Sequence, residues 1–294
     1  MRAALLFPLL LPLLLLVPGC GVESSREEER EEEPSEGFPL RLVDASGDTI
    51  LFRDPPRRVI SLVPSASRIL LALGAGERLA GRTDFDTAGA LAHLPSVGGG
   101  LNPSLEAVMA LDPDLVIRFG GESDPTTSLR LDDLGIAHLA VRPDGLRDIR
   151  RTIRHLGRIT GREKEADSIL GAMARDLERL EARVAGRPPV RVAYLLGGSP
   201  PWVAGPGSYL HELLELAGGV NVFADLEGLY GPVNAEAFLV RDMDLILAPE
   251  GIEVLLPRIP VPLRRVSPEL EIPGPDLARQ AWDLARILHP GVFR

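Results

Sequence analysis

The sequence predicts an α/β fold in which two small parallel-sheet lobes are joined by one long helix. The run Arg162–Val184 has the periodicity of a single amphipathic helix. The segments on either side of it repeat one order of strand and helix. Strands and helices alternate through 58–141 and 191–266, which favours parallel sheets covered by helices.

The long helix is the most clearly patterned part of the chain. Its charged residues lie on one side, and its apolar residues recur at a spacing of three and four, at Ala166, Ile169, Leu170, Met173, Leu177, Leu180 and Val184. Thr160-Gly161 marks its start and Pro188-Pro189 its end. At ~1.5 Å per residue it would span about 35 Å. A shorter helix, Leu146–Ile159, leads into it.

The flanking segments form an internal repeat. Arg58–Leu62 and Arg191–Leu195 are apolar runs typical of buried strands, and each is followed by a helical run that ends in glycine. Further along, two carboxylate pairs share a spacing of eight residues: Glu106 with Asp114, and Glu236 with Asp244. The shared order and spacing indicate two similar lobes.

Glu106 and Glu236 fall in the first turns of expected helices. One interpretation is that each only satisfies exposed backbone N–H groups and the helix dipole. Because the repeat places one carboxylate in each lobe, the alternative is a two-point docking site for a partner with two-fold symmetry.

The N-terminal run Met1–Cys20 predicts a lipoprotein signal peptide, with Cys20 as the acylated first residue of the mature chain. Its apolar stretch is shorter than the ~20 residues that a membrane span needs. An ordinary secretory signal or an uncleaved anchor remains the alternative. Cys20 is the only cysteine, which excludes an intrachain disulfide.

An acidic tether is expected to follow. Gly21–Gly37 holds eight Glu and two Arg, a net −6 of the −11 left after removal of the signal peptide. The remaining charge of about −5 is adverse to nucleic-acid binding. Phe38–Arg53 then alternates around Ala45–Asp48, as in a β-hairpin.

These features divide the chain into consecutive parts. The signal peptide is expected at 1–19, the acylated cysteine and tether at 20–37, and an N-terminal α/β lobe with its leading hairpin at 38–143. The connecting helices are expected at 144–189 and a C-terminal α/β lobe at 190–294.

The sequence gives little support for catalysis. It has no Gly-x-Ser-x-Gly elbow, no Walker loop and no His-Glu-x-x-His pair. The five histidines are scattered without metal-ligand spacing, at His93, His138, His155, His211 and His289. We therefore expect no catalytic residues, no bound metal and no cofactor.

Aromatic residues are rare, yet Phe85, Phe119, Trp202 and Tyr230 fall in or beside loops at the expected carboxyl ends of strands. Ligands bind at these ends in open parallel sheets. Flat rings in a cleft suit a large planar or apolar ligand. Each ring taken singly is as well explained as a core or loop anchor, but together they favour a binding cleft.

The chain resembles the ABC-transporter substrate-binding proteins with a helical backbone, which are the receptors for cobalamin, haem and ferric siderophores. The resemblance covers 38–293 and is strongest in these segments: Arg58–Ser65, Leu105–Ile117, Gly205–Asp225, Pro273-Gly274-Pro275 and Leu288-His289-Pro290. It implies that Phe85, Phe119 and Tyr230 line the cleft. It also implies that Glu106 and Glu236 meet arginine pockets on a permease dimer.

Three departures from the family pattern bear on the ligand. Arg68 stands where many relatives have glutamate, Gly100 where a cobalamin-binding relative has a cleft tryptophan, and Thr83–Thr87 lacks the usual Cys/Ser-Asp-Tyr-Pro. Cobalamin is the lead ligand, ahead of a ferric siderophore and haem. An enzyme on this scaffold and a signalling or structural lipoprotein remain alternatives of other classes.

Overall fold

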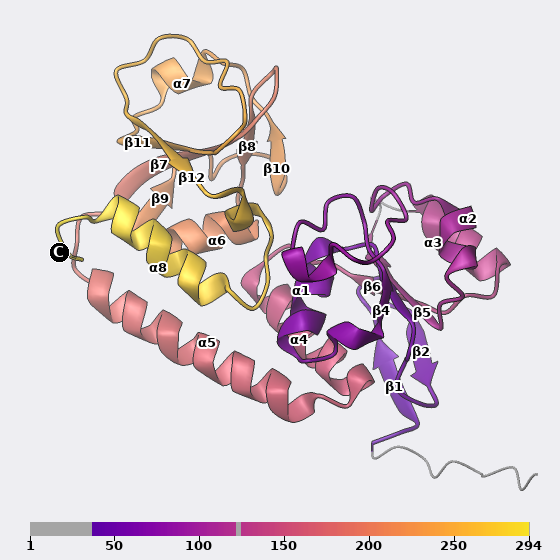
Figure 1. The fold of residues 1–294 in the computed structure, drawn as a ribbon. Helices are drawn as coiled ribbons and strands as arrows, with labels where there is room; N and C mark the ends of the chain where they lie inside the picture. The colour runs from indigo at the N-terminus through magenta and orange to yellow at the C-terminus, as the bar shows by residue number, and fades with distance from the viewer. Residues whose placement is uncertain (1–36, 122–124, 294) are drawn as a thin grey trace, which may run out of the picture. The chain divides into compact units, whose positions relative to one another are not determined.

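The structure is a computed structural model that describes residues 37–121 and 125–293 (Figure 1). The predicted signal peptide, the acylation of Cys20 and nearly all of the predicted tether lie outside these residues. No helix among the described residues is both long enough and apolar enough to cross a membrane.

The first lobe, from β1 to β6, contains a four-stranded parallel sheet. The strand order is β4-β3-β5-β6, with β3 at Val59–Ser61, β4 at Leu79–Gly81, β5 at Leu115–Phe119 and β6 at His138–Val141. Its helices are α1 (Pro64–Ala72), α2 (Leu105–Ala110) and α3 (Pro125–Asp133), with short 3-10 turns at Gly76–Arg78 and Gly89–Leu91. The predicted hairpin is confirmed as antiparallel strands β1 (Leu40–Val43) and β2 (Thr49–Phe52).

The second lobe, from β7 to α8, contains a six-stranded sheet. Its strands are β7 (Val190–Gly197), β8 (Trp202–Ala204), β9 (Gly219–Asn221), β10 (Tyr230–Pro232), β11 (Leu245–Pro249) and β12 (Leu263–Val266). β9, β7, β11 and β12 pair in parallel, whereas β8 and β10 join antiparallel at one edge. The helices are α6 (Tyr209–Leu216), α7 (Ala237–Val240) and α8 (Leu277–Leu288), with the 3-10 turn η3 at Pro268–Glu271.

The predicted connecting helices are confirmed as α4 (Leu146–Thr160) and the 22-residue α5 (Glu163–Val184). Gly161, in the left-handed region at φ 67°, closes α4 and breaks it from α5. α5 packs on α4 at one end and on α8 and α6 toward the other (Figure 1). The Trp282 indole also donates to the Asp176 carbonyl, 3.1 Å away, which ties α8 to α5.

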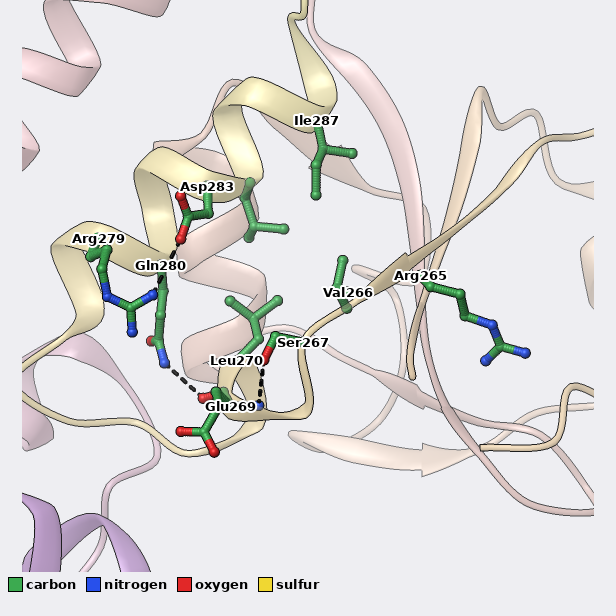
Figure 2. A pocket seen from close by; sticks show the side chains of 10 residues that line it. Arg265, Val266, Ser267, Glu269, Leu270, Arg279, Gln280, Asp283 and Ile287 are labelled. Atoms are coloured by element: carbon green, nitrogen blue, oxygen red, sulfur yellow. Dashed lines mark hydrogen bonds and ion pairs between the residues drawn. The ribbon is translucent and has the colours of Figure 1, made fainter. Parts of the chain in front are cut away.

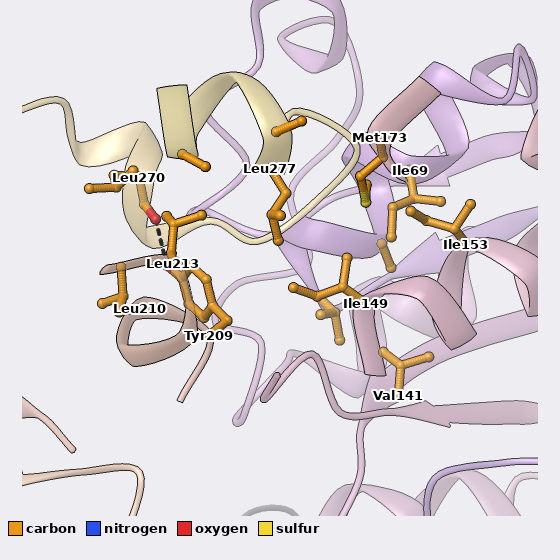
Figure 3. Packing of buried hydrophobic residues seen from close by; sticks show 14 of the residues in the cluster. Ile69, Val141, Ile149, Ile153, Met173, Tyr209, Leu210, Leu213, Leu270 and Leu277 are labelled. Atoms are coloured by element: carbon orange, nitrogen blue, oxygen red, sulfur yellow. Dashed lines mark hydrogen bonds between the residues drawn. The ribbon is translucent and has the colours of Figure 1, made fainter. Parts of the chain in front are cut away.

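One hydrophobic core runs through both lobes by way of α5. The buried stripe of α5 joins the same cluster as Ile149 and Ile153 of α4 and Leu277 of α8. Figure 3 shows Met173 of α5 close to Ile69 and Ile153. Because the two sheets share this core, the lobes are not independently packed bodies.

The internal repeat is visible in the strand pairing. Val59 lies opposite Leu115 in the first sheet, and Val192 lies opposite Leu245 in the second. The aspartate just before the partner strand holds the first strand in each lobe. Asp114 accepts from the Arg58 backbone N–H at 3.0 Å, and Asp244 accepts from the Arg191 backbone N–H at 2.8 Å.

We expect Leu180→Ala to lower the free energy of unfolding by about 2–5 kcal/mol, because it empties a fully buried site in the shared core. Chemical denaturation followed by circular dichroism measures this loss, and a single transition should persist. Glu178→Ala on the exposed side of α5 is the control and should change stability by less than about 0.5 kcal/mol. Two separated transitions in wild-type protein would contradict a core shared by both lobes.

Candidate ligand-binding site

Two of the predicted aromatic side chains flank the glycine run 98–100 in the first lobe. A Cβ added to Gly99 would lie 3.9 Å from the Phe85 ring, and one added to Gly100 would lie 3.2 Å from the Phe119 ring. Phe119 is the last residue of β5 and is half-buried, whereas Phe85 is 65% exposed. The two rings therefore border the same short segment at the carboxyl end of the first sheet.

The loop that carries Phe85 is held by a buried carboxylate. Asp86 accepts from the Thr83 backbone N–H at 2.9 Å and from the Thr83 hydroxyl at 2.8 Å. The Thr83 hydroxyl also accepts from the Phe85 backbone N–H at 3.2 Å. These bonds order the backbone while leaving the ring in solvent, so residues 83–87 keep a fixed aromatic platform without the usual family motif.

The backbone of a neighbouring segment leaves no room for a side chain at Gly100. A Cβ there would lie 2.4 Å from the Leu62 carbonyl oxygen, a distance that no side chain tolerates without a backbone shift. A tryptophan, which a cobalamin-binding relative has at the corresponding position, therefore cannot be accommodated by this backbone. The aromatic surface of the first lobe comes from Phe85 and Phe119 instead.

Trp202 and Tyr230 lie on the antiparallel edge of the second sheet. Tyr230 pairs with Ala204, and Pro232 pairs with Trp202. Since paired residues share a face and side chains alternate along a strand, Trp202 and Tyr230 project from the same face of this ribbon. Trp202 is 45% exposed, whereas Tyr230 is largely buried, so only Trp202 offers an open ring face.

The structure therefore brings the four predicted ligand residues together in two pairs. Among the described residues the ring contacts are Phe223 with Phe238 and Trp282 with Phe293, and neither involves the predicted four. Each lobe supplies one exposed ring and one partly buried ring.

A polar cluster that the sequence analysis missed lies next to Tyr230. All three tyrosines of the chain, Tyr194, Tyr209 and Tyr230, lie near Glu271, at the end of η3. Burial is the main reason that the pKa of each phenol is raised, and the charge of Glu271 adds to it. Burial also raises the pKa of Glu271 to about 7.

Two contacts join α4 and α1 to the second lobe. The Glu212 carboxylate accepts from the Leu146 backbone N–H at 2.6 Å, which places a negative charge at the N-terminus of α4. Arg68 of α1 forms an ion pair with Glu269 of η3. Arg68, the first departure from the family pattern, therefore joins α1 to η3 through this ion pair.

Two described pockets lie in the second lobe, and neither is large and apolar enough for a large planar chelate. Figure 2 shows a pocket of about 210 Å³ between β12, η3 and α8, below the ~300–1,000 Å³ of small-molecule sites. The other, of about 440 Å³, is lined by Tyr230 and by Arg241, whose guanidinium pairs with Asp225. Of the predicted ligand residues, Tyr230 alone lines either of them.

The two predicted docking carboxylates are both exposed, and neither acts as the side-chain cap of its helix. Ser104 caps α2, accepting from the Ala107 backbone N–H at 3.3 Å, while Glu106 has no hydrogen bond or ion pair within the described ranges. Glu236 occupies the N-cap position of α7 without a side-chain bond, and its own N–H donates to Asn234 at 3.2 Å. The capping interpretation is therefore weak for both residues.

An exposed apolar side chain follows each carboxylate at the same spacing. Met109 lies three residues after Glu106 and is 48% exposed, and Leu239 lies three residues after Glu236 and is 52% exposed. The repeat thus presents one carboxylate and one apolar side chain on each lobe.

The sequence matches a known family over most of the described chain. Residues 59–251 match the periplasmic binding protein family. The chain belongs to this family. The match includes the first sheet, the second sheet except β12, the helix α5 and all six predicted ligand and docking residues.

Relatives identified by sequence are named for binding or transport. An uncharacterised ABC transporter substrate-binding lipoprotein of Bacillus subtilis, YvrC, is 26% identical over 86% of this chain and 82% of its own length. A vitamin B12-binding protein of Vibrio cholerae is 28% identical over 67% of this chain and 71% of its own. A cobalamin-binding protein of Halobacterium salinarum is 32% identical over 71% of this chain, which spans only 58% of that relative.

Solved structures confirm the fold class. A haem-binding protein of Roseiflexus sp. RS-1 superposes with a TM-score of 0.70 at 22% identity, covering 80% of this chain and 99% of its own. The vitamin B12-binding protein of Vibrio cholerae gives 0.67 at 24% identity, covering 80% and 98%. The fold is that of the class III periplasmic binding proteins, with two α/β lobes on one backbone helix.

The raised pKa of Glu271 predicts a pH-dependent stability. Between its ordinary value of 4.5 and about 7, the folded protein keeps Glu271 protonated while the unfolded chain ionises it, so stability falls as the pH rises through this window. Glu271→Gln removes the ionisable group and therefore this fall in stability with rising pH. The melting temperature of Glu271→Gln minus that of wild type should therefore be small at pH 4.5 and grow toward pH 8.

Differential scanning calorimetry across this pH range measures the difference. Glu253→Gln, at an exposed carboxylate of the same lobe, is the control and should show a nearly constant difference. An equally flat profile for Glu271→Gln would mean that Glu271 is solvated.

Proposed function

We propose that this protein is the substrate-binding lipoprotein of an ABC importer that captures a metal chelate between its lobes and delivers it to a permease dimer. The lead ligand is cobalamin or another corrinoid, and a ferric siderophore is the alternative. The observation that carries the proposal is that each lobe has a pair of aromatic rings at one end of its sheet, Phe85 with Phe119 and Trp202 with Tyr230. The fold belongs to a family of periplasmic binding proteins.

The exposed rings support a large ligand with apolar faces. Phe85 is held by an ordered loop and Trp202 by a paired strand, so neither ring needs to be ordered when it binds a ligand. Exposed aromatic side chains on a rigid support are typical anchors of binding sites. The named functions of the Vibrio and Halobacterium relatives agree with a corrinoid.

Haem is less well supported because several of its candidate axial ligands are already engaged in other contacts or are largely buried. Haem iron is held by His, Tyr, Cys or Met side chains. His138 is bonded to Arg118 and Asp132, His289 contacts the Gly218 carbonyl, and burial raises the pKa of Tyr230, which opposes a phenolate ligand. No group of three or more metal-ligating side chains was found in the part of the chain that the structure describes.

The repeated surface of one carboxylate and one apolar residue per lobe supports docking to a symmetric partner. A two-fold permease presents the same surface twice, so each copy can meet one lobe. The lipoprotein assignment rests on Cys20 and agrees with the name of the Bacillus relative. It would keep the protein close to the permease.

We expect cobalamin to quench Trp202 fluorescence on binding and Phe119→Ala to weaken binding by about 1–3 kcal/mol, the usual cost of losing a buried aromatic anchor. Phe85→Ala should also weaken binding but leave the melting temperature near that of wild type, since its ring is exposed. Fluorescence titration gives both affinities.

Leu134→Ala, an exposed apolar side chain elsewhere in the first lobe, is the control for these variants and should bind as wild type does. Native mass spectrometry with cobalamin, haem and ferric siderophores identifies the preferred chelate. Saturable binding of free metal ions, with no binding of any chelate, would refute the proposed function.

The double variant Glu106→Gln with Glu236→Gln should bind ligand and melt as wild type does but fail to stimulate the ATPase of the reconstituted transporter. Exposed ion pairs are worth only about 0–1 kcal/mol each, so the association rate and specificity should depend on them most. Added salt screens the charges, so the difference from wild type should shrink as ionic strength rises.

A control with the same change in charge is Glu178→Gln with Glu181→Gln, at two exposed carboxylates of α5. This control should stimulate the ATPase normally. Undiminished stimulation by the Glu106 and Glu236 double variant at low salt would show that these residues do not dock the permease.

A further inference from the structure

An exposed arginine lies at the carboxyl end of the first sheet, next to the strand that carries Phe119. Arg142 directly follows β6, and β6 pairs with β5 so that Val141 lies opposite Phe119. The pairing extends one residue further, since the Gly120 backbone N–H donates to the Val141 carbonyl at 2.9 Å. Ligands bind beyond the carboxyl ends of parallel strands, so Arg142 lies at the end of the sheet where we expect the ligand.

Two glycines make room for the Arg142 side chain. A Cβ added to Gly120 would lie 3.2 Å from its Cγ atom, and one added to Gly121 would lie 3.0 Å from its Nη1 atom. The side chain therefore packs along this dipeptide, and a larger residue at either position would displace it. It nevertheless keeps 45% of its surface exposed, so a ligand can reach the guanidinium.

Asp144 orients this guanidinium without occupying all of it. One carboxylate oxygen of Asp144 accepts from the Arg142 Nε atom at 2.8 Å and pairs with the Nη2 atom at 2.7 Å. A guanidinium has five N–H donors, and no protein partner of the Nη1 atom is found within the described ranges. Arg142 is thus held in place with donors left for a ligand, and its exposed ion pair is too weak to exclude one.

The segment that carries Arg142 continues to the second lobe. The Leu146 backbone N–H donates to the Glu212 carboxylate of α6 at 2.6 Å. A Cβ added to Gly145 would lie 3.2 Å from the same carboxylate. Arg142 is four residues from this contact, which is at most ~14 Å along an extended chain. It therefore lies near the junction of the two lobes, on the side of the first lobe.

Two other arginines near this end of the first sheet are not available in the same way. Arg118 is 3% exposed and donates to the Phe119 carbonyl at 3.0 Å. The side chain of Arg68 is 13% exposed and is engaged by Glu269. Of these three arginines, Arg142 is the one that combines an exposed guanidinium with unused donors.

We propose that Arg142 binds an anionic oxygen group of the ligand, either a phosphate diester or a carboxylate. Guanidinium groups bind both through paired N–H donors, and a support that fixes the fork lowers the entropy lost on binding. Phe85 and Phe119 would then contact an apolar face of the ligand, while Arg142 binds a charged group at its edge.

This inference rests on the proposed function and narrows its ligand class. A complete corrinoid such as cobalamin carries a phosphate diester between a ring side chain and its nucleotide base. Iron chelates of the citrate type carry carboxylates instead. Cobinamide, which lacks the phosphate, and neutral hydroxamate chelates such as ferrichrome offer no such group.

The test compares an anionic and a neutral member of each ligand class. Calorimetric titration measures cyanocobalamin against dicyanocobinamide, and ferric citrate against ferrichrome. Wild-type protein should prefer the anionic member in the class that it binds, which identifies the source of the anion. Arg142→Gln should lower this preference about tenfold or more, the loss expected for a hydrogen bond to a charged group.

Two variants and a salt series separate recognition from a structural role. Arg142→Lys keeps the charge but not the fork, so its preference should lie between those of wild type and Arg142→Gln. Arg175→Gln, at an exposed arginine of α5, is the control and should keep the wild-type ratio. The wild-type preference should shrink as sodium chloride rises, whereas the residual preference of Arg142→Gln should change little.

An unchanged ratio in Arg142→Gln would overturn the inference. Equal weakening of the anionic and neutral members would also overturn it, because Arg142 would then only maintain the shape of the site. If wild type binds only neutral chelates, this inference fails while the importer function stands. If it binds none of the four chelates, both fail.

Discussion

The packing of α5 against both lobes is the constraint on which the rest of the structure depends. Its buried stripe contacts α4 on one side and α8 on the other, so one core stabilises both sheets. A large closing motion would have to break this packing or bend a continuous helix. Ligand recognition must therefore come mainly from side chains that are already in place, which agrees with the ordered supports of Phe85 and Trp202.

The parts of the fold that depend on local patterns could be predicted from the sequence. The apolar stripe of α5 has a helical period over its whole length, and its observed start is within one residue of the predicted one. The internal repeat could also be predicted from the sequence. Asp114 and Asp244 each accept a hydrogen bond from the backbone N–H at the start of the equivalent strand in their lobe. The helical stripe depends only on residues close together in the chain, and the aspartate contact occurs in both lobes, so both leave a pattern in the sequence.

The remaining features depend on contacts between distant elements. From the sequence alone, Glu271 would be interpreted as a solvated carboxylate. The folded chain shows that it is partly buried near tyrosines from β7, α6 and β10. The reason for Gly100 lies in the Leu62 carbonyl, 38 positions away in the chain. The rarity of tyrosine was the one available signal for the cluster, since all three residues of this type converge there.

The two lobes resemble each other where a symmetric partner would touch them and differ where a ligand would. Glu106 and Glu236 occupy equivalent positions in the repeat, and each is followed three residues later by an exposed apolar side chain. The first lobe, in contrast, offers phenylalanine rings, and the second offers a tryptophan beside a cluster of tyrosines and a carboxylate. This division is physically consistent, because a permease dimer is two-fold symmetric and a chelate with an apolar face and a polar rim is not. A repeat could then keep one surface constant for the transporter while the other diverged for the ligand.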